Sequence, residues 1–372
     1  MKKILFIITY LELGGAQKQL LYLLKGLDKD KYSLFLCSGD AGYLKSKFLE
    51  IPNVKIRLIP SLVRQINPIL DLVTFFKLFL FIRKHKFDIV HTHCPKASIL
   101  GRWAAFFAGT KNIVCTIHGW SFSKYMGIIS YYFFLTLEKI TAKITKKMIF
   151  VSRADLDIAL KNKILDSKKL YLIRCGVEID KFDRVFQERC STAIDKRLII
   201  NISSFKPQKG AFYFLKMADN LLKKSYNLKF LIAGDGPYRR EVLKQLNSLN
   251  LKDKVILGGW VEDISSLLAK CSIFVLPSLW EGLPLSVIEA VISGVPLVAT
   301  DTGGLKDIVK NYSQGIIVEP REIEELSKAV IAILDNYDEW QDKIRRNRQE
   351  IDLSYWSKDR MVKETEDVYQ AL

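Results

Sequence analysis

The chain has 372 residues, of which 49% are hydrophobic and 26% charged, with 20 glycines and 10 prolines. This length favours two compact units, and the composition excludes a disordered, collagen-like or low-complexity protein. The formal net charge of +17 is uneven, because residues 1–180 carry 29 basic and 13 acidic side chains whereas residues 181–372 carry 28 and 27. A positive field in one half indicates an anionic partner for that half, either an acidic membrane or a nucleic acid.

Six scattered cysteines form no C-x-x-C pair, so the sequence predicts neither a zinc site nor a disulfide framework and favours a reducing compartment. The chain begins with Met and two lysines and then enters the short apolar run 4–8. A run of five residues is shorter than the apolar core of a secretory signal and predicts a buried strand. We therefore expect a cytoplasmic protein.

Short apolar runs alternate with longer helical stretches, a pattern typical of βαβ units around parallel sheets. In the first half the pattern predicts strands at residues 3–8, 32–37, 56–59, 89–93, 112–117, 148–151 and 170–173. In the second half it predicts strands at residues 197–202, 229–233, 255–257, 273–276, 297–299 and 315–318. Two such series predict an α/β protein with two parallel-sheet domains.

A polar stretch without hydrophobic periodicity, residues 181–196, separates the two series and predicts a linker. The predicted domains are therefore residues 1–180 and 197–352, followed by a terminal helix at residues 353–372. We expect Tyr355 and Trp356 to anchor that last helix.

A first stretch of the N-terminal half is more apolar than a helix packed on a sheet requires. Between residues 69 and 82 the polar side chains are Asp71, Thr74 and Lys77. Their spacing of three predicts one narrow solvent-facing stripe on a helix.

A second such stretch, residues 125–137, is uncharged and rich in aromatic side chains. Both stretches are shorter than the roughly 20 residues that cross a bilayer. Each fits a helix lying on an anionic membrane surface, and each also fits a helix buried between a sheet and its neighbours. The charge excess favours the membrane, and the lysines expected to meet it follow the second stretch: Lys139, Lys143, Lys146 and Lys147.

The segment PSLWEGLPLSVIEA, residues 277–290, follows a predicted buried strand and leads into an amphipathic helix. Glu281 is thereby placed at the carboxyl end of the strand, where open α/β sheets bind ligands, and Glu289 inside the helix. Backbone N–H groups of Gly282 and Leu283 near the helix start suit a phosphate. Paired carboxylates accept hydrogen bonds from sugar or ribose hydroxyls.

With this segment the chain resembles family 4 of the retaining glycosyltransferases, and the likeness spans almost its whole length. The resemblance implies the GT-B fold, in which two Rossmann-like domains face a central cleft and a C-terminal helix crosses back to the first domain. Glu281 and Glu289 match the family's E-x7-E pattern. In this family the first glutamate faces the transferred sugar and the second binds the ribose of the nucleotide.

Three further motifs extend the resemblance. Gly15 belongs to a glycine loop that the family brings close to the donor phosphates, although such a glycine also suits an ordinary helix start. His118 matches the family's histidine near the transferred sugar, although a histidine at a strand end is often structural. Lys209 matches the lysine that pairs with the diphosphate. Many family members have an arginine where this chain has Ser204, so Lys206 is a further candidate for a diphosphate contact.

Other patterns favour structural roles. The turns at residues 234–237 and 301–304 match glycine turns of the family and are expected to shape loops. The D-x-D pairs at residues 28–30 and 155–157 fit a surface turn and a helix start rather than a metal site. Strand alternation separates His91 from Cys94. We predict no metal in the chemistry and no cofactor besides the nucleotide-sugar substrate.

The resemblance therefore implies a metal-independent hexosyltransferase that moves a sugar, with retention, from a nucleotide-diphosphate donor to a lipid-linked or other anionic saccharide in bacterial surface polysaccharide synthesis. The expected acceptor is a polyprenyl-diphosphate-linked saccharide or glycolipid, with no nucleic-acid partner, at the inner face of the plasma membrane. Two alternatives remain. One is a sugar-nucleotide epimerase of the same architecture, and the other is a non-catalytic basic scaffold or nucleic-acid-binding protein, although the basic residues form no recognisable RNA-binding module.

Overall fold

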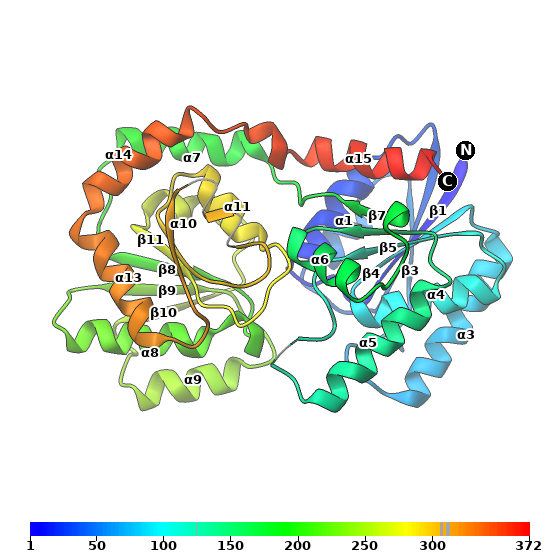
Figure 1. Ribbon diagram of the computed structural model, residues 1–372, viewed down its shortest axis with the longest axis horizontal. Helices are drawn as coiled ribbons and strands as arrows, with labels where there is room; N and C mark the ends of the chain where they lie inside the picture. The colour runs from blue at the N-terminus through cyan, green and yellow to red at the C-terminus, as the bar shows by residue number, and fades with distance from the viewer. Residues whose placement is uncertain (124, 306–307, 310–312) are drawn as a thin grey trace. The chain divides into compact units, whose positions relative to one another are not determined.

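The computed structural model of the protein describes residues 1–372 except 124, 306–307 and 310–312. The chain divides into two compact units, each built on a parallel sheet (Figure 1). Unit 1 comprises Met1–Gly176 and Lys358–Leu372, and unit 2 comprises Val177–Ser357. The predicted α/β class is confirmed. All thirteen predicted strands are present among the described residues, with bounds shifted by no more than two residues.

In unit 1 the described residues form a seven-stranded sheet in the order β3-β2-β1-β4-β5-β6-β7. Its strands are β1 (Lys2–Ile8), β2 (Tyr32–Ser38), β3 (Val54–Leu58), β4 (Ile89–His93), β5 (Asn112–Ile117), β6 (Lys147–Phe150) and β7 (Leu170–Leu172). Its helices are α1 (Gly15–Gly26), α2 (Lys45–Leu49), α3 (Pro68–His85), α4 (Pro95–Phe107), α5 (Ile128–Ala142), α6 (Arg153–Lys161) and α15 (Lys358–Gln370), with a 3-10 turn at Ser167–Lys169.

Both faces of this sheet are covered, which explains why β1 is an unbroken apolar run. Ile4 and Phe6 pack with α1, α2 and α15 on one face, whereas Leu5 and Ile7 pack with α3 and α4 on the other. The last helix of the chain, α15, belongs to unit 1 because Tyr369 is buried in the same core as β1. The predicted return of the C-terminal helix to the first domain is thereby confirmed.

In unit 2 the described residues form a six-stranded sheet in the order β10-β9-β8-β11-β12-β13. Its strands are β8 (Leu198–Ile202), β9 (Lys229–Ala233), β10 (Val255–Gly259), β11 (Ile273–Leu276), β12 (Leu297–Thr300) and β13 (Gly315–Val318). Its described helices are α7 (Ile179–Ser191), α8 (Ala211–Lys223), α9 (Arg239–Ser248), α10 (Ser265–Lys270), α11 (Leu285–Ile292), α13 (Ile323–Asp335) and α14 (Tyr337–Arg348), with 3-10 turns at Pro207–Lys209 and Leu353–Trp356. The central strands β8 and β11 pair directly, and their carboxyl ends carry the two loops described in the next section.

The prediction of a linker at residues 181–196 is wrong over most of that range, because α7 is a regular helix of unit 2. Phe182 and Val185 are buried on one side of it, and the charged side chains that hid this periodicity cover the others. Arg189 is also buried, where its Nη1 donates to the main-chain oxygens of Leu268 at 2.8 Å and Cys271 at 2.7 Å. A charged residue therefore serves as an internal contact of the helix.

The solvent-facing polar stripe predicted for residues 69–82 holds for Lys77, which is exposed, and is wrong for its other two members. Thr74 of α3 is fully buried, and its Oγ1 donates to Ser61 Oγ at 2.8 Å. Asp71 forms an ion pair with Lys96 of α4 at 2.5 Å. Both polar side chains therefore face neighbouring parts of unit 1, and the opposite side of α3 meets solvent with apolar side chains.

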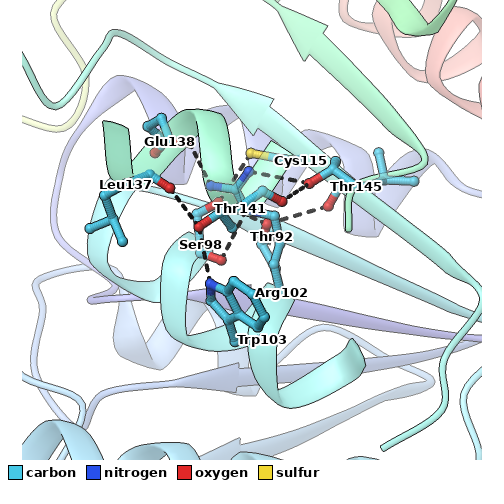
Figure 2. A network of polar contacts seen from close by, with 10 residues as sticks. Thr92, Ser98, Arg102, Trp103, Cys115, Leu137, Glu138, Thr141 and Thr145 are labelled. Atoms are coloured by element: carbon cyan, nitrogen blue, oxygen red, sulfur yellow. Dashed lines mark hydrogen bonds and ion pairs between the residues drawn. The ribbon is translucent and has the colours of Figure 1, made fainter. Parts of the chain in front are cut away.

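A buried polar network joins α4 to α5 (Figure 2). Arg102 of α4 is 0% exposed, and its Nη2 donates to Glu138 Oε2 of α5 at 2.7 Å. The same guanidinium donates to the main-chain oxygen of Ser98 at 3.2 Å and to Thr145 Oγ1 at 3.3 Å. A buried ion pair of this kind holds the two helices in one register, because a shift would leave each buried charge without its partner at a large cost in free energy.

Candidate active site

An ion pair lies at the carboxyl end of β11 in unit 2. Lys209 Nζ lies 2.7 Å from both Oε1 and Oε2 of Glu281, and Ser278 Oγ donates to Oε1 at 2.7 Å. The Glu281 side chain is 5% exposed and that of Lys209 is 20% exposed. Three contacts thus fix one carboxylate beside a cation that solvent can still reach. The structure brings together two residues that lie 72 positions apart and that the sequence analysis took from separate motifs.

The loop after β8 is locked against the loop after β11. Gly210 follows Lys209 with a φ of +72°, and a Cβ on it would lie 1.8 Å from the main-chain oxygen of Pro277. Close by, Leu279 N donates to the main-chain oxygen of Gln208 at 2.7 Å. Only glycine fits at position 210, because the backbone is left-handed there and another chain segment occupies the side-chain space.

A third loop, after β12, supports the backbone of Glu281 itself. Gly303 has a φ of +54°, and a Cβ on it would lie 2.2 Å from the main-chain oxygen of Glu281. Gly304 N donates to the main-chain oxygen of Gly282 at 2.9 Å. The glycine pair at residues 303–304 therefore shapes the loop that carries Glu281.

Replacing Gly303 by alanine is expected to cost about 1–3 kcal/mol of stability and to displace Glu281, because the new Cβ meets a backbone oxygen that cannot rotate away. The matched control is Gly259→Ala, where φ is +65° but no heavy atom lies within 4 Å of the built Cβ. Urea denaturation and a transfer assay on both variants separate the clash from the cost of the left-handed backbone. Equal loss of transfer in the two variants would contradict the placement of Gly303 behind Glu281.

The other predicted donor-binding residues of unit 2 lie close in the sequence to Lys209 or to Glu281. Gly282 and Leu283 are buried in the turn before α11, and Glu289 is buried within α11. Lys206 begins the short turn that ends in Lys209, and its backbone N donates to the main-chain oxygen of Ser204 at 2.8 Å. Their roles toward a nucleotide sugar remain predictions.

In unit 1, His118 follows β5 and lies at the end of a row of polar side chains. Its Nε2 is 3.1 Å from His93 Nδ1 of β4. His91, on the same face of β4, contacts Thr116 Oγ1 through Nε2 at 2.7 Å and Tyr369 Oη of α15 through Nδ1. The sequence analysis missed His93 as a neighbour of His118 and Tyr369 as a partner of His91. The spacing of two between His91 and His93 was the available signal, because alternate residues of a strand share a face.

Burial keeps these imidazoles neutral. It lowers the pKa of His118 to about 4 and that of His91 to about 3, with a smaller effect of His118 on His91. The pKa of His93 is lowered well below its ordinary value by burial and then by His91 and His118. A neutral imidazole donates one hydrogen bond and accepts another, so His118 is able to hold a hydroxyl group at physiological pH.

The buried His91 makes unit 1 less stable in acid. Its pKa rises from about 3 in the folded chain towards about 6.5 on unfolding, so the unfolded chain binds the additional proton between these values and stability falls as the pH drops below 6.5. We expect His91 to account for about 2 kcal/mol of the stability lost between pH 7.5 and pH 5. The measurement is urea denaturation at both pH values for the wild type and His91→Gln. An unchanged pH difference in the variant would refute this assignment.

Gly15, the remaining predicted donor contact, is the first residue of α1. Gly14 precedes it with extended backbone, and the first turn of α1 holds no acidic side chain. Nearby, Gln17 Nε2 donates to the main-chain oxygen of Tyr10 at 2.8 Å, which ties the helix start to the end of β1. Within the described parts of the chain, no three His, Cys, Asp or Glu side chains gather in a group that could hold a metal ion.

Two family descriptions match consecutive parts of the chain. "Glycosyltransferase Family 4" matches residues 13–181, and "Glycosyl transferases group 1" matches residues 186–350. The chain is 31% identical to the UDP-Gal:alpha-D-GlcNAc-diphosphoundecaprenol alpha-1,3-galactosyltransferase of Escherichia coli, over 87% of this chain and 86% of that protein. It is 25% identical to the capsular polysaccharide biosynthesis glycosyltransferase CapM of Staphylococcus aureus, over 83% and 82%.

A solved structure shares the fold. The crystal structure of Anabaena HepE in complex with UDP and glucose superposes with a TM-score of 0.80 at 19% identity and covers 100% of both chains. At this identity the likeness establishes the architecture, and the E. coli relative carries the assignment to a family.

Proposed function

Since this chain belongs to the family 4 glycosyltransferases, we propose that it transfers a hexose from a nucleotide-diphosphate donor to a polyprenyl-diphosphate-linked saccharide during bacterial surface polysaccharide synthesis. The observation that supports this most directly is the Lys209–Glu281 pair at the strand ends of unit 2. The E. coli relative uses UDP-galactose and a diphosphoundecaprenol acceptor, as its name states, so these are the first donor and acceptor class to test.

In the proposed reaction, Lys209 supplies positive charge to the donor diphosphate. The bond between the anomeric carbon and the diphosphate oxygen breaks, and the acceptor hydroxyl oxygen forms the new bond on the same face of the sugar. The hydroxyl proton passes to the leaving diphosphate, so no covalent glycosyl-enzyme forms. A cation at the diphosphate lowers the barrier because negative charge grows there in the transition state.

Glu281 serves this reaction in two ways. Without donor it neutralises Lys209 and, with Ser278, occupies one defined orientation. When Lys209 pairs with the donor diphosphate instead of with Glu281, the carboxylate becomes available to accept hydrogen bonds from hydroxyls of the transferred sugar. Glu289 is proposed to bind the ribose, with the amides of Gly282 and Leu283 toward the diphosphate and His118 toward the sugar. We propose that no metal takes part, because Lys209 provides the charge at the leaving group.

A donor panel tests this function. Release of nucleoside diphosphate is measured with each nucleotide sugar, with and without bacterial lipid extract as acceptor and in the presence of EDTA. We expect release that requires acceptor and survives EDTA. Conversion of the donor into another nucleotide sugar without acceptor would instead establish an epimerase, and loss of activity in EDTA would refute metal independence.

We also propose that unit 1 meets an anionic membrane surface. The charge excess of residues 1–180 and the polyprenyl acceptor of the E. coli relative support this. No helix in the described part of the chain is long and apolar enough to cross a bilayer. Of the predicted lysines, Lys143 and Lys146 are exposed after α5 and Lys139 is partly exposed within it, whereas Lys147 lies over the ring of Tyr171 and donates to its hydroxyl. Lys147 is therefore the least available of the four.

A further inference from the structure

Helix α3 has two apolar sides, of which only one is packed. Leu78 and Ile82 are buried against the sheet together with Thr74. Five large apolar side chains on the other side face solvent, Ile69 being 76% and Phe76 51% exposed. At 100° per residue these five fall within an arc of about 100° around the helix axis. The exposed residues are Ile69, Leu72, Val73, Phe76 and Leu80.

The neighbouring helices α4 and α5 also carry exposed apolar side chains. On α5, Ile129 is 84% exposed, and Phe106 and Phe107 at the end of α4 are also exposed. Of the 21 large apolar side chains exposed among the described residues, 12 lie on α3, α4 and α5, which together hold 46 residues. Single exposed apolar side chains are ordinary, but a cluster of this size marks an interaction surface. The remaining members on α5 are Ile128, Tyr132, Phe133 and Ile140.

Direct contacts hold the three helices side by side (Figure 1). Phe107 of α4 packs edge-on against Phe75 of α3, with ring centroids 6.0 Å apart. Trp103 of α4 donates to Thr141 of α5 at 3.1 Å, next to the buried Arg102–Glu138 pair (Figure 2). The 12 side chains therefore belong to one three-helix layer, which we call the α3–α5 face.

The exposed charges on the helices of the α3–α5 face are basic. The three helices contain two acidic residues, and both are neutralised, Asp71 by Lys96 and Glu138 by Arg102. Exposed basic side chains stand on the same helices and at their ends: Lys77, Arg83, Lys84, Lys86, Lys143 and Lys146. An apolar centre with a predominantly cationic rim matches the acyl chains and headgroups of an anionic leaflet.

We propose that the α3–α5 face is the membrane-docking surface and that its apolar side chains enter an anionic bilayer leaflet. This inference rests on the proposed function, because a lipid-linked acceptor is reached at such a surface. Insertion of the side chains supplies most of the binding, and the basic rim adds attraction to acidic lipids. A second copy of this chain is the poorer occupant, because a two-fold interface would set the cationic rim against itself.

The test uses the full-length protein and vesicles of phosphatidylcholine mixed equally with phosphatidylglycerol, without donor or acceptor. The face variant is Leu72→Ser, Phe76→Ser and Leu80→Ser combined. Its matched control is Tyr43→Ser, Leu49→Ser and Ile256→Ser, which removes three apolar side chains that are exposed elsewhere. We expect the partition coefficient of the face variant to fall at least about tenfold, and that of the control to stay at the wild-type value.

Equal partitioning of the face variant and the wild type would overturn the proposal, and so would an equal loss in the control. If the face variant instead lowers the mass of the protein in lipid-free sedimentation while vesicle binding persists, the surface belongs to a second copy. Transfer to detergent-dispersed acceptor is measured in parallel. Absence of transfer in a wild type that binds vesicles would refute the proposed function alone. Intact transfer together with equal partitioning of the face variant and its control would refute the surface alone.

Discussion

Glu281→Ala is expected to lower the rate of sugar transfer by about 100- to 1,000-fold, because the carboxylate beside the lysine that we propose binds the diphosphate is lost while the rest of the site stays in place. The measurement is the acceptor-dependent release of nucleoside diphosphate under saturating donor. Lys209→Met should produce a loss of the same order, because it removes the positive charge that we propose stabilises the leaving diphosphate.

Two controls accompany this experiment. Glu281→Gln keeps the size of the side chain and tests the charge, and Glu241→Ala removes an exposed acid from α9 in the same unit. Glu281→Ala is expected to unfold in urea near the wild-type midpoint, since the Lys209 that it leaves unpaired retains contact with solvent. Lys209→Met is expected to lower the midpoint, because it leaves the nearly buried Glu281 carboxylate without its cation. Wild-type turnover in Glu281→Ala would remove this residue from the proposed mechanism, whereas a collapsed midpoint would show that the loss is structural.

Arg102→Leu is expected to destabilise the protein by about 3–5 kcal/mol, the largest stability effect we predict, because Glu138 is left charged and buried without its partner. The free energy of unfolding is measured by urea denaturation at neutral pH. The same change should loosen α5 from α4, since the guanidinium also holds Thr145 of the turn after α5 (Figure 2).

Further variants show whether the lost pairing is the cause. Arg102→Leu combined with Glu138→Leu should recover most of the stability, because apolar pairs often replace buried ion pairs without loss. Arg153→Ala breaks the exposed Arg153–Asp157 pair and should cost less than about 1 kcal/mol. A double variant as unstable as Arg102→Leu would mean that packing, rather than an unpaired charge, dominates.

The central strands could be predicted from the sequence because both sheets are parallel and these strands are buried on both faces. A strand buried on two sides is a short continuous apolar run, and that signal is local. The E-x7-E segment, the lysine and the glycine turns were also visible as local patterns after predicted strands. Local patterns therefore determined the fold class, the family resemblance and the candidate residues.

The errors arose where a side chain's environment is set by distant residues. Thr74 faces inward because Ser61 offers it a hydrogen-bond partner, and Arg189 is buried because main-chain carbonyl groups near the end of α10 accept hydrogen bonds from its guanidinium. Polarity alone predicts that both side chains are exposed to solvent. Burying a polar side chain costs desolvation free energy unless a hydrogen-bond partner inside the fold compensates for it. The same rule explains why the linker and the polar stripe of α3 were predicted wrongly.

What the sequence determined by itself is which segments become strands and helices and which residue types stand at the strand ends, because periodicity and turn chemistry act over a few residues. The tertiary structure decided that Lys209 meets Glu281, that Tyr369 returns to His91, and that the apolar side of α3 faces outward. These outcomes depend on hydrogen bonds and packing between residues far apart in the chain, which exist only once the sheets have assembled.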